Sequence, residues 1–244
     1  MNKTAWTGYC SALDRYRNLI KTTSNAVSAS VIEQLVKNRE GPSYTVDTPV
    51  VFNQALNDIT IDSVIKLILV GDNPGRREQA AENCRYLVGP SGKIAENFFR
   101  NSPELSIDFR KHVLIINKTP IHTPRTNELK ELCTVGGERI KNAVIASQKE
   151  MALLLKEFWA ALSVPVWIIG YSEMKKGGIF EVYTDTIKNL CRDNQSFENS
   201  IFLYRHFSMN QFTIDLNQKR LPGENLPDCL KRIGREYRKR VLSN

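Results

Sequence analysis

The sequence predicts an α/β fold in which a central parallel sheet of four strands lies between two layers of helices. Four short apolar runs predict the buried strands, at residues 64–70, 113–116, 166–169 and 200–204. Their side chains are apolar at successive positions, as in parallel strands covered on both faces. Segments of helical length separate these runs, which is the pattern of a three-layer α/β/α fold. A chain of 244 residues is long enough for one such domain.

The first sixty residues are predicted to form a helical extension packed on a single domain that spans residues 1–244. Residues 4–20 place aromatic and aliphatic side chains at three- and four-residue spacing, which predicts an amphipathic helix. A second helix is predicted at 26–37, where Gly41 and Pro42 then end it, and a loop with short local structure follows at 43–60.

The later helices follow from the same periodicity. Residues 76–83 are expected to begin a short helix after the first strand. Ser91 is a candidate cap for the helix that runs through 94–99. The polar loop after the second strand is expected to carry His122 at its surface. Longer helices are predicted at 138–162, 179–191 and 226–242.

Composition favours a polyanionic partner. The net charge is +8 and the isoelectric point is about 9.3, and lysine and arginine neutralise phosphates. A solvated basic face is the alternative interpretation. No apolar run has the length of a membrane span, and residues 1–22 lack the apolar core of a signal peptide, so we expect a cytoplasmic protein. Five dispersed cysteines without a CxxC pair predict reduced, structural thiols.

Polar side chains follow three of the four predicted strands. Asp72 and Asn73 come after the first, Asn117 after the second and His206 after the fourth. Parallel strands bring these ends to one edge, where open α/β sheets bind ligands. An acid, two amides and an imidazole in one crevice can bind and hydrolyse a polar ligand. The alternatives are a plain turn for Asp72 and Asn73, a loop cap for Asn117, and a structural histidine.

Four segments resemble the motifs of the uracil-DNA glycosylase superfamily, in the family's order and at the predicted strand ends. GDNPGRRE is similar to the first motif, GxxPGxxE, and LVGPSG is similar to the FVGxxG segment that follows it. VLIINKTP resembles the second strand, which ends in an asparagine, and RHFS resembles the late HPS motif. The matching residues are Gly71, Pro74, Gly75 and Glu78, then Leu87 to Gly92, Asn117, and His206 with Ser208.

This resemblance implies a monofunctional DNA glycosylase that hydrolyses the N-glycosidic bond of uracil or a related deaminated base. Such enzymes flip the base into a pocket. The family's roles place Asp72 or Asn73 at the sugar and water, Asn117 on the base and His206 on the leaving group. One branch of the family has an acid second in the first motif, as Asp72 is here. Another branch has an asparagine third, as Asn73 is here. The sequence does not decide whether Asp72 or Asn73 is the catalytic residue.

The resemblance also implies a set of binding residues and no cofactor. The family's iron–sulfur cysteines are absent, no motif lysine stands as a Schiff-base nucleophile, and water is the expected nucleophile. Leu87 replaces a stacking phenylalanine, which gives up ~1 kcal/mol. We expect a monomer that binds DNA; the alternative is an inactive DNA- or nucleotide-binding protein of the same fold. The predicted substrate-binding residues are Gly71, Pro74, Gly75, Leu87, Asn117 and Ser208, and the predicted DNA contacts are Ser91, Phe207 and Met209, with helix capping or core packing as their alternatives.

Overall fold

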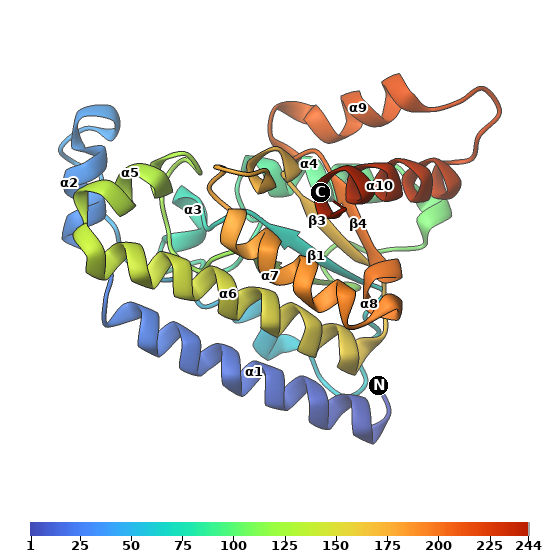
Figure 1. Ribbon diagram of the computed structural model, residues 1–244, viewed down its shortest axis with the longest axis horizontal. Helices are drawn as coiled ribbons and strands as arrows, with labels where there is room; N and C mark the ends of the chain where they lie inside the picture. Colours follow the sequence, from blue (N-terminus) through green and yellow to red (C-terminus); the bar gives the residue numbers. More distant parts are fainter. Residues whose placement is uncertain (244) are drawn as a thin grey trace.

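The computed structural model describes residues 1–243 and has a four-stranded, all-parallel sheet at its centre (Figure 1). The strand order is β2-β1-β3-β4, and β1 runs parallel to both of its neighbours in the sheet, β2 and β3. The predicted α/β fold with four parallel strands is therefore confirmed. The strands are β1 (Leu67–Gly71), β2 (Val113–Asn117), β3 (Val166–Ile169) and β4 (Ile201–Tyr204).

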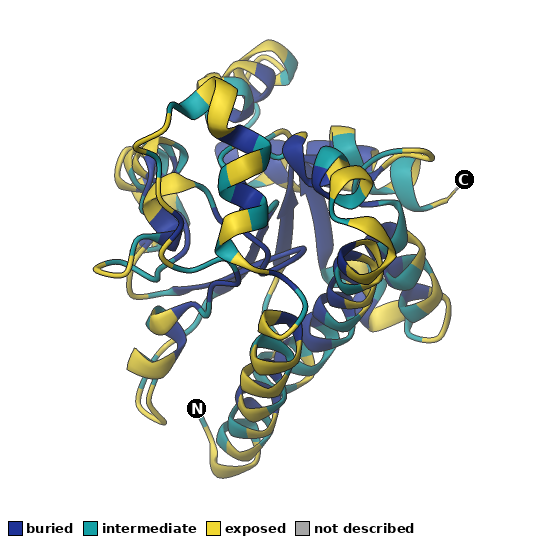
Figure 2. Ribbon diagram, turned by 90° about the vertical axis from the view of Figure 1, so that its left-hand side faces the viewer, coloured by how far each residue is buried: buried dark blue, intermediate teal, exposed yellow. Residues whose placement is uncertain are grey.

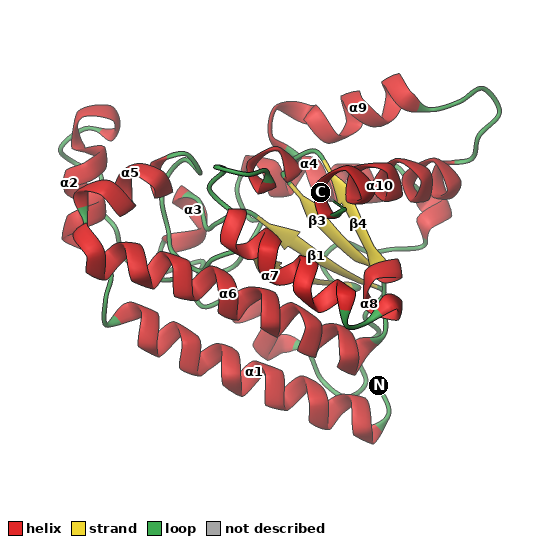
Figure 3. Cartoon of the chain, in the orientation of Figure 1, coloured by secondary structure: helices red, strands yellow, loops and turns green. Residues whose placement is uncertain are grey.

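Helices cover both faces of this sheet, whose strands are buried along their whole length (Figures 2 and 3). One layer holds α1 (Lys3–Ser24), α6 (Gly137–Leu162) and α7 (Glu181–Arg192), and the other holds α4 (Pro90–Arg100), α9 (Gln211–Lys219) and α10 (Leu226–Leu242). The remaining elements are α2 (Ala29–Glu40), α3 (Arg76–Gln79), α5 (Glu128–Val135), α8 (Gln195–Ser200), and the 3-10 helices Gln54–Asp58, Pro103–Leu105, Tyr171–Met174 and Ser208–Asn210.

Aromatic side chains join β3 to the second helix layer. Trp167 stacks on Phe99 of α4, with ring centroids 5.5 Å apart, and on Phe212 of α9 at 6.0 Å. α10 packs on β4, where a Cβ added to Gly234 would lie 2.7 Å from the Phe202 Cβ. The small residue therefore lets this helix approach the strand closely.

Strand register decides which side chains face which layer at the carboxyl edge. Gly71 pairs with Asn117, and both lie on the same face as Trp167 because alternate residues share a face. The next residues, Asp72 and Lys118, fall on the α7 face. The Lys118 Nζ indeed lies 4.9 Å from the centroid of the Phe180 ring, which immediately precedes α7.

The N-terminal helices reach the loops at this edge. α1 packs along α6, and Figure 1 shows α2 beside α5. Arg39 of α2 pairs with Glu128 of α5 at 3.1 Å, and Glu40 pairs with Arg76 of α3. Tyr44 also bonds the Nε2 of His122 at 2.7 Å. The extension therefore supports the loops that follow β1 and β2.

Three helices were not predicted, and β1 starts later than expected. α5 and α8 are short, and Asn127 before α5 makes no side-chain capping bond. α9 follows Met209 and Asn210, which both have positive φ angles, so it lacks an extended N-terminal signal. Val64 is 59% exposed and lies outside the sheet. Among residues 1–243, no helix combines the length and apolarity needed to cross a membrane.

Candidate functional site

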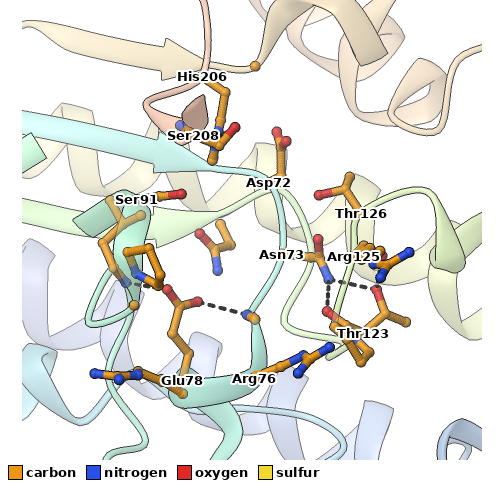
Figure 4. A pocket seen from close by; sticks show the side chains of 18 of the residues that line it. Asp72, Asn73, Arg76, Glu78, Ser91, Thr123, Arg125, Thr126, His206 and Ser208 are labelled. Atoms are coloured by element: carbon orange, nitrogen blue, oxygen red, sulfur yellow. Dashed lines mark hydrogen bonds between the residues drawn. The ribbon is translucent and has the colours of Figure 1, made fainter. Parts of the chain in front are cut away.

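A cavity of about 740 Å³ opens at the carboxyl edge of the sheet and is lined by Asp72, Asn73, Asn117 and His206. The strand ends therefore converge as the sequence predicts. Gly75, Leu87, Ser91, Ser208 and Met209 of the predicted binding residues also line it. Figure 4 shows Asp72 and His206 on one side of this pocket, and Asn73 turned toward Thr123 and Arg125.

Asp72 lies at the switch point of the sheet, where the chain runs from β1 to β2 on one side and β3 adjoins on the other. Its carboxylate packs against Gly170, the residue after β3. A Cβ on Gly170 would lie 2.5 Å from the Asp72 Oδ1, and φ at Gly170 is +78°. Glycine is required here both by the backbone conformation and by the space that the carboxylate occupies.

Lys118 is the buried counter-ion of Asp72. Its side chain is 0% exposed, and its Nζ lies 2.5 Å from the Asp72 Oδ1. The Nζ also donates to the carbonyls of Ile169 at 2.6 Å and Gly71 at 3.4 Å. Burial lowers the pKa of Lys118, and the Asp72 charge opposes this shift. The ammonium thus joins the ends of β1, β2 and β3.

Asn117 presents an unpaired amide. The residue is 2% exposed and lines the pocket, and its Nδ2 has no hydrogen-bond partner in the described chain. Gly71, its partner in register, leaves room for the side chain: a Cβ there would lie 2.4 Å from the Asn117 Oδ1. Asn117 therefore does not cap the loop. Because an unsatisfied buried donor is costly, this amide indicates a site for a ligand acceptor.

Asn73 is fastened to the loop after β2. Its Nδ2 donates to the Thr123 Oγ1 at 2.9 Å and to the Thr123 carbonyl at 3.3 Å (Figure 4). The amide nitrogen is therefore occupied, and the Oδ1 is the atom left to accept a bond from water or a ligand.

His206 has a defined tautomer. The backbone N–H of Ser208 donates to its Nδ1 at 3.0 Å, and the Ser208 hydroxyl lies 2.8 Å from the same atom. The proton of the neutral ring is therefore on Nε2, which can donate to a ligand. Burial lowers the pKa of His206; Asp72 acts against this shift and Lys118 adds to it. The ring is thus a neutral donor around neutral pH.

Glu78 ties the turn after β1 to the turn before α4. Its carboxylate accepts the N–H of Gly75 at 3.0 Å and that of Leu87 at 2.8 Å. Burial raises its pKa to about 7, while the two backbone bonds act in the opposite direction. Glu78 is a structural residue of the pocket wall.

Replacing Glu78 by glutamine is expected to change how stability depends on pH. Between its ordinary pKa of 4.5 and about 7, the folded protein holds a proton at Glu78 that the unfolded chain has released. The wild-type free energy of unfolding therefore falls as pH rises through this window, and Glu78→Gln lacks that fall. The stability advantage of the wild type over the variant should shrink by ~1–3 kcal/mol between about pH 5 and about pH 8, measured by urea unfolding. An advantage independent of pH would contradict the burial of this carboxyl group.

Leu87 lies on a strained turn in the pocket wall. Its φ is 54°, and its carbonyl accepts a bond from the Arg110 Nη2 at 2.9 Å. A Cβ on Gly92 would fall 1.6 Å from this carbonyl oxygen, so only glycine fits there. The motif glycine therefore allows the turn to fold back on the start of α4.

Three expectations from the sequence are wrong. Phe207 is 0% exposed and stacks on Phe212 at 4.5 Å, so it packs in the core and is not accessible to DNA. Ser91 does not cap α4, because Gly89 is its N-cap; Ser91 lies in the first turn at the pocket. His122 is 0% exposed rather than at the surface, and its Nδ1 contacts the Pro74 carbonyl at 2.8 Å. Burial lowers the pKa of His122 to about 4.

Two groups of residues at this site were not singled out in the sequence: the fully buried Lys118, which pairs with Asp72, and several polar residues that line the cavity. The signal for Lys118 was its position after Asn117 at the end of an apolar strand, which places it on the opposite face. The others are polar residues around the cavity: Arg76, Arg77, Thr123, Arg125 and Thr126.

Comparisons with protein-family models, curated proteins and solved structures find no match to this chain. Within the described residues, no three His, Cys, Asp or Glu side chains are grouped so that they can hold a metal ion, and all five cysteines are free.

Proposed function

We propose that this protein is a monofunctional DNA glycosylase of the uracil-DNA glycosylase superfamily, which releases uracil or a related deaminated base from DNA. The observation that carries the proposal is the unpaired Asn117 amide, buried in the same pocket as Asp72 and His206. A primary amide can donate to the O4 of uracil and accept from its N3–H, and few other side chains can do both.

The pocket groups suit the charges that develop as the N-glycosidic bond breaks. The bond's electron pair leaves with the base, and positive charge develops on the sugar, as in other glycoside hydrolyses. The Nε2–H of His206 stabilises the base anion, and the Asp72 carboxylate stabilises the sugar cation. A water oxygen then bonds to C1′ and releases its proton, and the base takes up a proton.

Lys118 supports hydrolysis rather than attack by an amine. Its three N–H groups have three acceptors, and its side chain is fully buried. An ammonium held in this way has no lone pair for a Schiff base. Water is therefore the nucleophile in this proposal, and the product is an intact strand with an abasic site.

Positive and apolar groups at the mouth of the cavity suit DNA. Arg76, Arg77 and Arg125 line it with exposed side chains, in a chain of net charge +8. Met209 is 82% exposed, its φ is 52°, and it lies three residues after His206 in the turn that follows β4. An exposed apolar side chain on a turn at the pocket fits a wedge between base pairs.

Replacing Met209 by alanine is expected to slow base release from duplex DNA about tenfold, because the wedge fills the space left by the flipped base. Release from single-stranded DNA should change little, since no base stack has to be opened. The measurement is kcat/KM on matched duplex and single strands. Leu221→Ala, which removes an exposed side chain outside the cavity lining, is the control. Equal losses on both substrates would contradict the wedge.

The proposed function is tested with labelled oligonucleotides that contain uracil, hypoxanthine or xanthine, incubated with the protein and then cleaved with alkali. Strand scission that requires both protein and alkali supports a monofunctional glycosylase. Absence of scission from every strand, in any pairing or single-stranded, refutes the enzyme. DNA binding that weakens steeply with salt would then favour a binding protein without chemistry.

A further inference from the structure

Lys118 contacts Asp72 through its backbone as well as through its side chain. The backbone N–H of Lys118 donates to the carbonyls of Gly71 at 3.0 Å and Asp72 at 3.1 Å, while its Nζ bonds the Asp72 carboxylate. Lys118 thus holds both the backbone and the side chain of the residue at the switch point. The Phe180 ring and the Ile169 carbonyl complete the enclosure of its ammonium.

This arrangement leaves one carboxylate oxygen for a ligand. The Oδ1 of Asp72 is bonded by Lys118, and Gly170 closes the side toward β3. No described residue hydrogen-bonds the Oδ2, and the side chain is 11% exposed in the cavity. The titratable groups that act on the pair are His206, which faces Asp72, and Glu173, which acts on Lys118.

We propose that Lys118 is a positioning residue for the proposed base release: its buried ammonium fixes the Asp72 carboxylate so that the free Oδ2 faces the sugar. This inference rests on the proposed function. It also assigns the two neighbouring polar residues different tasks. Asp72 is held by a charge and acts at the sugar, whereas Asn73 is held by Thr123 at the loop and is left with one acceptor oxygen.

If Lys118 were only structural, it would stabilise the fold without changing the rate of base release by the folded protein. The two alternatives are separated by measuring the single-turnover rate of base release and the Kd for a strand with a 2′-fluorinated uracil nucleoside, which resists cleavage. Lys118→Met should lower the rate about 10²-fold and change the Kd less than about threefold. Thr119→Val is the matched control. It changes the residue next to Lys118 and removes a buried hydroxyl that bonds to Ser147, and its rate should stay near that of the wild type.

The decisive comparison is with Asp72→Asn. If Lys118 acts through Asp72, the double variant Asp72→Asn/Lys118→Met should be as slow as Asp72→Asn alone, within about threefold. This comparison does not use the Lys118→Met single variant, so it remains informative if that variant folds poorly. A further loss in the double variant, or a single variant within threefold of wild type, overturns the proposal.

Failure of the proposed function gives a different result. If the wild type releases no base from any strand, the function is refuted, and the positioning claim is judged from crystal structures of the wild type and Lys118→Met. An Asp72 carboxylate that keeps its place in the variant overturns the claim. A carboxylate that turns away supports it, whatever ligand the site binds.

Discussion

Asp72→Asn is expected to lower the single-turnover rate of uracil release about 10³-fold, because a neutral amide cannot stabilise the positive charge on the sugar. The variant also leaves Lys118 buried without its counter-charge, so we expect a loss of stability of ~3 kcal/mol. Rate and thermal unfolding are measured on the same preparation, at a temperature where the variant is folded.

Asn73→Ala is the matched control for this prediction. Asn73 is bonded to Thr123 and keeps only its Oδ1 for water, so its loss should cost about tenfold in rate. A loss in Asn73→Ala larger than that in Asp72→Asn would reverse the assignment and make the amide the principal catalytic group.

Asn117→Ala is expected to lower kcat/KM for uracil by about 10²–10³-fold, because the base loses its paired donor and acceptor. The cavity left by the side chain faces the pocket, so the fold should be affected little. Asn117→Asp gives a sharper test. Its carboxylate cannot donate to the O4 of uracil, but it can accept from the amino group of cytosine.

Gain of cytosine release in Asn117→Asp, together with loss of uracil release, would show that this residue reads the base. Release of uracil by Asn117→Ala at the wild-type rate would contradict the proposed role. Gly71, which pairs with Asn117 in the sheet, offers a test of whether the position of the amide matters. Gly71→Ala adds a methyl group against the Asn117 Oδ1 and should reproduce the loss by displacing the amide.

The sheet and the convergence of its strand ends were predictable because they depend on local apolar runs and on parallel pairing. Uninterrupted apolar strands separated by helices leave few topologies, and these topologies place Asp72, Asn117 and His206 at one edge. The helix at 226–242 was also predicted to its ends, since Pro227 and an apolar stripe mark it.

The partners of the site residues were not predictable, because they depend on contacts between segments far apart in sequence. In the sequence, Lys118 looks like an ordinary loop lysine. Its burial depends on the Ile169 carbonyl of β3 and on the Phe180 ring before α7, which are both distant in the chain. His122 is buried where it contacts Tyr44 of the N-terminal extension and the Pro74 carbonyl. Phe207 was predicted to contact DNA, but it is covered by Phe212 of α9, a helix that the sequence did not predict.

The most direct test of the central claim is the identity of the products formed from a single uracil-containing strand, followed by mass spectrometry before any alkali treatment. We predict free uracil and an unbroken strand with one abasic site in equal amounts, and the same products from Asp72→Asn about 10³-fold more slowly under conditions where it is folded. No free uracil from the wild type, or free uracil from Asp72→Asn at the wild-type rate, would contradict the account.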